Sequence, residues 1–232
     1  YALHTFSPFK LPDEIVDIHL CRIYEDSNNN LWIGTQNRGV YCYSLQYKNV
    51  KHYRTGRVDC IMEDSRGTIY IAAGRLFRIL QGSDILQKVN FKNENRNDVR
   101  CVVEDEDGML WIGGKSWLGY ADVDANDVTG ASYHINKVLQ QGTYWGKDFS
   151  NVMSLYFDKD KNLWIGTYGH GLYMLSGKQS FFHSLTFNPL DNQSISGKKI
   201  QAIACNAQSG ETVISIENVG IDVLGYDGKC IR

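Results

Sequence analysis

The sequence has no long hydrophobic run and no excess of either charge. No apolar stretch approaches the roughly 18 residues of a membrane-spanning helix, and the first residues lack the basic and apolar regions of a signal peptide. The 24 basic and 26 acidic residues are interspersed and give a formal net charge of -2, which leaves no electrostatic footprint for nucleic acid or for an anionic membrane surface. We therefore expect a soluble segment that neither spans a membrane nor binds nucleic acid.

Proline is scarce as well, at 3 of 232 residues, and no low-complexity tract or change in composition marks a linker. The six cysteines lie far apart, without the CxxC spacing of a zinc site or the density of a disulfide scaffold. We therefore expect one domain over residues 1–232, in which the cysteines are unpaired and largely buried. Because the chain starts at Tyr1, within a segment that resembles a strand already under way, we expect an excised piece.

The strongest signal that the sequence does contain is a repeat. The segment LWIGT at 31–35 recurs at 69–73, 110–114, 163–167 and, weakened, at 212–216. Two aliphatic residues three places apart precede every copy, and in the first four copies an acidic turn follows them. If the aliphatic pair marks the first segment of the repeat and the LWIGT copy the second, a third segment begins after each copy. A fourth segment surrounds His52, Lys88, His134 and His183, and the segment around His4 matches the same place.

Four short strands in a period of about 40 residues, separated by turn residues, are typical of β-propeller blades. We therefore predict an all-β fold of five four-stranded blades, over about 13–54, 55–92, 93–136, 147–186 and 196–232. One such sheet cannot cover both of its apolar faces, so neighbouring blades must stack. The space between blades is predicted to be filled by Trp32, Tyr70, Trp111 and Trp164, and the small residue two places after each is expected to allow close packing. Helical periodicity is scarce, and only 136–141 is a candidate for a helical turn.

The combined string of aliphatic pair, acidic turn, LWIGT and Gly-Leu-Tyr resembles the two-component regulator propeller repeat, most closely at 157–175. The second copy lacks the tryptophan, and the fifth lacks the tryptophan and the acidic turn. Proteins of this family carry seven-bladed propellers outside the inner membrane, then a spanning helix and a histidine kinase. The resemblance implies a partial piece of a seven-bladed, periplasmic sensor propeller that recognises an oligosaccharide and contacts neighbouring propeller and signalling domains. An open arc would expose sheet faces and favour self-association, for example as a homodimer.

An enzyme is the main alternative, because the turns also resemble the Asp-box of sialidase-type glycosidases. The match at 65–68 is partial, and the aromatic residue falls one place later than that box expects. Glycosidases need two carboxylates flanking the scissile bond, whereas the repeated acidic residues here are turn residues at one end of every blade. No arginine cluster suited to a carboxylated sugar is evident either. We therefore expect a region without catalytic activity; a protein-interaction scaffold is the second alternative.

Metal and cofactor sites are not expected. The repeated histidines His4, His52, His134 and His183 occupy one outer-strand position, so the fold separates them blade by blade, and strand packing is their expected role. Asp158, Asp160 and Asn162 alternate as in the start of a calcium loop, but the later glycine and glutamate are missing.

For ligand binding, the sequence favours one face of the propeller. This face is lined by the loops that join the second strand to the third and the fourth strand to the next blade. The candidate ligand-binding residues on it are Arg38, Lys115, Trp117, Tyr144, Trp145, Lys147, Tyr168, His170 and Asn218. Exposed aromatic rings flanked by amides and charges suit a sugar, whose apolar face stacks on the rings. Alternatively, Trp117 and Trp145 pack the insertion against the propeller, or the face docks a partner domain.

Overall fold

The structure is a computed structural model. It describes residues 11–15, 18–91, 98–121, 132–133, 135–140, 151–176, 182–206, 209, 211–225 and 229–231. Within this part of the chain, no helix has the length and apolar character that crossing a bilayer requires.

The described residues form five antiparallel sheets that follow one another along the chain. Blade 1 consists of β1 (Leu20–Glu25), β2 (Asn30–Thr35), β3 (Val40–Ser44) and β4 (Val50–Tyr53), after a short 3-10 turn, η1 (Asp13–Ile15). Blade 2 consists of β5 (Cys60–Glu63), β6 (Ile69–Ala73), β7 (Arg75–Ile79) and β8 (Gln87–Lys88). Blade 3 consists of β10 (Val99–Glu104), β11 (Leu110–Gly114), β12 (Trp117–Ala121) and β14 (Ile135–Gln140). Blade 4 consists of β15 (Val152–Phe157), β16 (Leu163–Thr167), β17 (Leu172–Leu175) and β18 (Phe182–Leu185), and blade 5 of β19 (Ile200–Cys205), β20 (Thr212–Ile216) and β21 (Gly220–Leu224).

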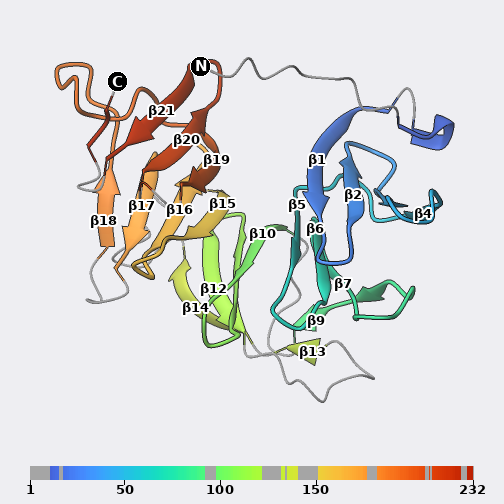
Figure 1. The fold of residues 1–232 in the computed structure, drawn as a ribbon. Coiled ribbons are helices and arrows are strands. Elements are labelled where there is room, and N and C mark those ends of the chain that lie inside the picture. Colours follow the sequence, from blue (N-terminus) through green and yellow to red (C-terminus); the bar gives the residue numbers. More distant parts are fainter. Residues whose placement is uncertain are drawn as a thin grey trace.

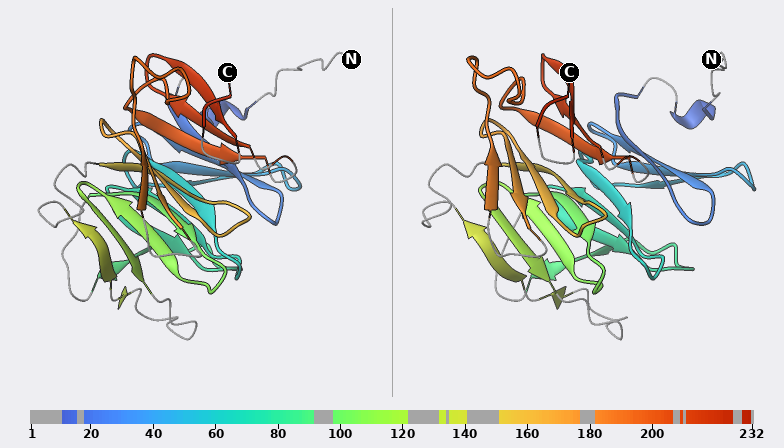
Figure 2. Two further views of the ribbon diagram at one scale, coloured as in Figure 1. Left: turned by 90° about the vertical axis from the view of Figure 1, so that its left-hand side faces the viewer. Right: turned by 60° about the vertical axis from the view of Figure 1, so that its left-hand side comes forward.

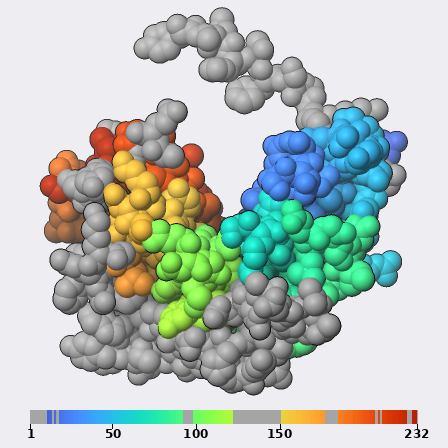
Figure 3. All heavy atoms as spheres, turned by 60° about the horizontal axis from the view of Figure 1, so that its bottom comes forward, coloured from blue at the N-terminus to red at the C-terminus, as the bar shows by residue number. Residues whose placement is uncertain are grey.

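The blades are arranged as an open arc, with blade 1 and blade 5 at its two ends (Figures 1 and 3). The first strands line the concave side of the arc, where β5 packs on β1, β10 on β5, β15 on β10 and β19 on β15. The views in Figure 2 show the sheets stacked face to face. This is the β-propeller arrangement that the repeat predicts; the number of blades in a complete ring stays a prediction.

Two details of the strand order correct the expectations from the sequence. The helical turn predicted over 136–141 does not form in its described part, because 135–140 are the fourth strand of blade 3 and pair with β12. The free edge of β12 offers this segment backbone partners that outweigh its weak helical pattern. Blade 5 has three described strands instead of four, and only an isolated bridge between Leu224 and Cys230 extends it. Outside the blades, β9 (Asn90–Phe91) pairs in parallel with β13 (Ser132–Tyr133).

From blade 2 onwards, the aliphatic pair at the start of each blade packs into the preceding blade. In blade 2, Val58 and Ile61 are buried in a cluster with Trp32, Val40 and Cys42 of blade 1. The equivalent residues of blades 3, 4 and 5 are buried or partly buried in the same way against blades 2, 3 and 4. A blade of this kind therefore carries an apolar ridge on one face and accepts the ridge of the next blade on the other.

The small residues after the anchor aromatics make this close packing possible. A Cβ atom added at Gly34 would lie 2.7 Å from Val58, and one at Gly113 would lie 2.6 Å from Val152. Such distances are shorter than real carbon contacts, so a larger residue would push neighbouring blades apart. The close-packing role predicted for this position is confirmed at both glycines.

The anchor aromatics are held by the acidic turns. Trp32 and Trp164 are buried and Trp111 is half-buried, and each indole Nε1 donates to the turn aspartate six residues earlier, at 2.7 to 2.8 Å. Tyr70 takes the place of the tryptophan in blade 2 and is 1% exposed. The acidic turn and the tryptophan therefore recur together because they bond to each other.

The predicted state of the cysteines is also confirmed. All six are free, and each is buried or partly buried. Three of them, Cys21, Cys60 and Cys101, direct their Sγ atoms to a main-chain carbonyl on the first strand, or just before it, of the next blade. These thiols are therefore small filling groups between blades that also satisfy a weak donor.

Candidate functional site: the loop end of the arc

The loops between second and third strands of all five blades gather on one face of the arc, which we call the loop end. Main-chain hydrogen bonds tie these loops to the segment that enters the same or the next blade: Gln36 N–H to His19 O, Val58 N–H to Thr35 O, Lys115 N–H to Asp98 O, Tyr168 N–H to Asn151 O and Glu217 N–H to Lys199 O. The loop end is therefore a surface whose backbone is fixed by the neighbouring blades.

Several predicted ligand-binding residues lie exposed at the loop end. Arg38 and Lys115 are exposed in the turns of blades 1 and 3, and Asn218 is exposed in blade 5 with a left-handed φ of 61°. His170 is half-buried, and its Nδ1 has no hydrogen-bond partner among the described residues. Tyr144, Trp145 and Lys147 lie outside the described residues, so their predicted role stays a prediction.

Trp117 corrects the expectation of an exposed aromatic ring. Its side chain is 0% exposed and belongs to the apolar cluster between blades 2 and 3, which includes Tyr70 and Val99. The turn before it, in which Ser116 has a φ of 64°, places Trp117 opposite Gly114, where the missing Cβ leaves room for the indole. Its Nε1 donates to Asp98 Oδ1 at 3.1 Å. Trp117 therefore packs the fold and is not a platform for a ligand.

Tyr168 does lie exposed and forms a cluster with two charged residues. The Lys199 ammonium lies 4.7 Å from the centre of the Tyr168 ring and 3.7 Å from Glu217 Oε2. The hydrogen bond to Tyr168 and the charge of Glu217 raise the pKa of the Lys199 ammonium, so this group stays cationic. The cluster joins blades 4 and 5 and presents a ring beside a fixed positive charge.

A second cluster at the loop end was not foreseen from the sequence. Arg57 Nε lies 3.1 Å from Asp59 Oδ1, and Arg100 Nη1 lies 3.5 Å from Asp59 Oδ2. Arg22 donates from Nε to the Asp59 carbonyl at 2.6 Å and from Nη1 to the Cys21 carbonyl. Two guanidinium groups therefore face one nearly buried carboxylate, and a third, from Arg22, binds the main-chain carbonyl of the same residue. No arginine cluster suited to a carboxylated sugar was evident from the sequence, and this grouping is the arginine cluster that stacking of the blades produces.

The sequence signal for this cluster appears when the repeats are aligned, so that equivalent positions form columns. Asp59 and Arg100 both follow the first aliphatic residue of their blades, Val58 and Val99. Residues in one column of adjacent blades face each other across the stack, so opposite charges in one column predict an ion pair. Arg57 precedes the same column in blade 2, and because the three arginines are more than thirty residues apart, their spacing in the sequence alone does not indicate a cluster.

The structure also locates the residues that were considered for metal binding. Asp158 accepts four hydrogen bonds, from the N–H groups of Asp160 and Asn162, the Asn162 side chain and Trp164 Nε1, so its oxygens are engaged in the turn. His52 stacks on Tyr41, with ring centres 4.2 Å apart, as expected for strand packing. His4 and His134 lie outside the described residues.

The comparisons with known proteins agree with this fold. The family model described as two component regulator propeller matches residues 16–37, 93–116 and 146–169. No curated protein matches the sequence. A solved structure with a similar fold is the extracellular domain of the putative hybrid two component system BT4673 from B. thetaiotaomicron, with a TM-score of 0.72, 19% identity and coverage of 92% of this chain and 28% of that chain.

Two further solved structures have a similar fold. The extracellular domain of the putative hybrid two component system BT3049 from B. thetaiotaomicron has a TM-score of 0.64 and 22% identity, and covers 87% of this chain and 26% of that chain. A putative gluconolactonase has a TM-score of 0.65 and 15% identity, and covers 92% of this chain and 76% of that chain. At these identities the likeness establishes the fold alone. The matched segments confirm the predicted resemblance: the chain is a β-propeller arc in which residues 16–37, 93–116 and 146–169 match the two component regulator propeller family.

Proposed function

We propose that this chain is part of the extracytoplasmic sensor region of a two-component signalling protein. In this proposal the loop end binds an oligosaccharide, without catalysis, in the periplasm, and the event is relayed to a histidine kinase elsewhere in the polypeptide. The repeat match and the similarity to extracellular domains of hybrid two component systems support the sensor role. The chain spans 28% and 26% of the length of the two B. thetaiotaomicron domains. The histidine kinase and the other parts of the whole protein are therefore part of the proposal.

The arginine cluster is the observation that carries the choice of ligand. The Arg57 and Arg100 guanidinium groups face the Asp59 carboxylate, Arg22 binds the Asp59 main-chain carbonyl beside them, and the Arg57 side chain is 55% exposed. A guanidinium group binds a planar carboxylate or a sulfate through two parallel hydrogen bonds. We therefore infer that the preferred oligosaccharide carries acidic groups, such as uronic acid carboxylates or sulfate esters.

Tyr168 supports a sugar over a simple anion. Tyr168 is 38% exposed at the loop end, and Lys199 beside its ring is a fixed cation. The C–H face of a pyranose stacks on such a ring, while its acidic group is attracted to lysine or arginine.

Calorimetric titration with a panel of neutral, uronic acid and sulfated oligosaccharides tests the proposal. We expect an acidic member to bind, to bind more weakly as salt is added, and to lose about tenfold or more in affinity in Arg57→Ala, because one charge-assisted contact is removed. Lys88→Ala, which removes an exposed cation of the outer strand β8, is the matched control and should leave the affinity unchanged. Equal losses in both variants, or a panel without any binder, would contradict the proposal. Breakdown products in the titrated mixtures that disappear in Asp59→Asn would favour a glycosidase instead.

A further inference from the structure

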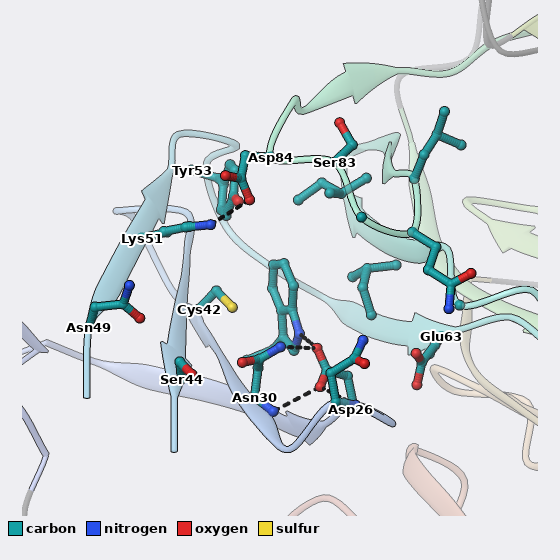
Figure 4. Close-up of a pocket in the computed structure, with 18 of the residues that line it drawn as sticks. Asp26, Asn30, Cys42, Ser44, Asn49, Lys51, Tyr53, Glu63, Ser83 and Asp84 are labelled. Carbon is teal, nitrogen blue, oxygen red and sulfur yellow. Dashed lines mark hydrogen bonds and ion pairs between the residues drawn. The ribbon is translucent and has the colours of Figure 1, made fainter. Parts of the chain in front are cut away.

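A cavity of about 410 Å³ lies between blades 1 and 2, on the face of the arc opposite the loop end (Figure 4). The β1–β2 and β3–β4 turns of blade 1 form one wall, and the β7–β8 connection of blade 2 forms the other. We propose that this cavity, called the interblade cleft below, binds a small neutral polyhydroxylated molecule of monosaccharide or disaccharide size. Its volume lies in the lower part of the range of small-molecule sites, about 300 to 1,000 Å³.

Unused amide groups line the cleft from both sides. The side chains of Asn28 and Asn49 of blade 1 and Gln81 of blade 2 line it and make no hydrogen bond to the described residues. An amide carries two N–H donors and a carbonyl acceptor, so it can pair with a hydroxyl group, which also donates and accepts. Three such groups on facing walls match a ligand with hydroxyls on opposite edges.

The charged groups of the cleft are already engaged. Glu63 accepts from Ser27 N–H at 2.7 Å and from Ser27 Oγ at 2.6 Å. Lys51 of blade 1 and Asp84 of blade 2 form an ion pair across the cleft (Figure 4). The Asp26 carboxylate accepts four hydrogen bonds from its own turn and from Trp32. An anion would meet these carboxylates, and each carboxylate is already bound by Lys51 or by hydrogen-bond donors of the protein, so the amides are the groups left to bind a neutral ligand.

The floor of the cleft is apolar and uncharged. It is formed by Trp32, Cys42, Tyr53, Ile69 and Ile79. Burial raises the pKa of the Cys42 thiol and of the Tyr53 phenol to about 12, so both groups are protonated at neutral pH. A floor of this kind covers the C–H surface of a sugar ring while the amides bind its hydroxyls.

A second cavity provides an internal comparison. It has a volume of about 420 Å³, lies between blades 3 and 4, and includes Trp111, the counterpart of Trp32. Its walls carry Glu106, Asp107 and Lys161 in place of the amides, and Lys161 is paired with Glu106 at 2.6 Å. The two cavities thus share a position between blades but differ in chemistry, so the proposal applies to the interblade cleft alone.

The experiment follows the indole N–H signals of the full chain in ¹H–¹⁵N spectra during titration. The probes are glucose, galactose, mannose, N-acetylglucosamine, maltose, cellobiose and lactose, each added alone. Trp32 lines the cleft, whereas Trp164 has the same bond to its turn aspartate but lines neither cavity. We expect at least one sugar to shift the Trp32 signal in a saturable way and to leave the Trp164 signal in place. If no sugar of the panel shifts Trp32, the proposal is overturned.

Variants then assign the bound sugar to the cleft. Asn49→Ala and Gln81→Ala should each weaken binding about three- to tenfold, the range for one lost hydrogen bond, without loss of folding because both side chains are exposed. Gln36→Ala removes an exposed side chain at the loop end of the same blade and serves as the control. If Gln36→Ala or Arg57→Ala weakens binding and the cleft variants do not, the sugar binds at the loop end and the cleft proposal is wrong. The two proposals therefore fail independently.

Discussion

Asp26 accepts four hydrogen bonds within one hairpin. One oxygen receives the N–H groups of Asn28 and Asn30 at 3.0 and 2.8 Å, and the other receives the Asn30 amide and Trp32 Nε1 at 2.9 and 2.7 Å. The same carboxylate therefore closes the turn and holds the indole that separates two blades. Asp105 and Asp158 bind their turn and their tryptophan in the same way, which explains why the acidic turn recurs with the aromatic anchor.

Asp26→Ala should lower the free energy of unfolding by about 3 kcal/mol, because it removes a charged acceptor and leaves the buried Trp32 N–H unsatisfied. Urea unfolding followed by tryptophan fluorescence measures the change. Asp107→Ala is the matched control, since Asp107 is an exposed turn residue, and it should change stability by less than about 0.5 kcal/mol. Similar losses in the two variants would mean that the Asp26 hydrogen bonds contribute little.

At the scale of the strand, the last residue of a first strand binds the preceding blade. Glu63, at the end of β5, accepts two hydrogen bonds from Ser27 in the turn of blade 1. Glu104, at the end of β10, accepts two from Ser65 in the turn of blade 2, at 2.6 and 3.0 Å. Between blades 3 and 4 this position is Phe157, whose ring meets Trp111 edge to face. One position of the repeat thus joins neighbouring blades by either polar or aromatic contacts.

Glu63→Ala should destabilise the protein by about 1 kcal/mol, because both bonds to Ser27 are lost at an exposed site. Glu25→Ala, which changes the equivalent exposed residue of blade 1, should have almost no effect. A double-mutant cycle with Ser27→Ala isolates the contact, and we expect a coupling of roughly 1 kcal/mol between Ser27 and Glu63. A coupling near zero would show that the turn is held by its own hairpin alone.

How much the sequence predicts depends on whether a feature belongs to one blade or to two. The strands, turns and anchor aromatics follow from residues close together in one repeat, and the structure agrees with them apart from β14 and the shorter blade 5. The arginine cluster and the interblade cleft depend on side chains that only stacking brings together. The burial of Trp117 depends on a single backbone angle at Ser116, which residue type does not determine. Features shared between blades are therefore found only by comparing columns of the repeat.

At the scale of the whole molecule, the two ends of the arc expose apolar side chains that are covered elsewhere. On blade 1, Leu20 is 40% and Ile23 is 65% exposed, whereas their counterparts on blade 2, Val58 and Ile61, are 1% and 8% exposed. On blade 5, Ile221 is 70% exposed. Exposed faces of this kind are surfaces for association.

Ile23 and Ile61 hold the same position in successive blades, so comparing them tests whether the face of blade 1 is uncovered in the isolated chain. Ile61→Ala should cost about 3 kcal/mol of unfolding free energy, since it leaves a cavity between blades 1 and 2, whereas Ile23→Ala should stay within about 0.5 kcal/mol. Ile23→Lys should instead reduce self-association of the chain in sedimentation velocity experiments, because a charge on the open ridge disfavours its burial against another molecule. If Ile23→Lys left the sedimentation profile unchanged while the unmodified chain associated, the contact would have to lie away from blade 1, and the exposed face of blade 5 would be the next surface to alter.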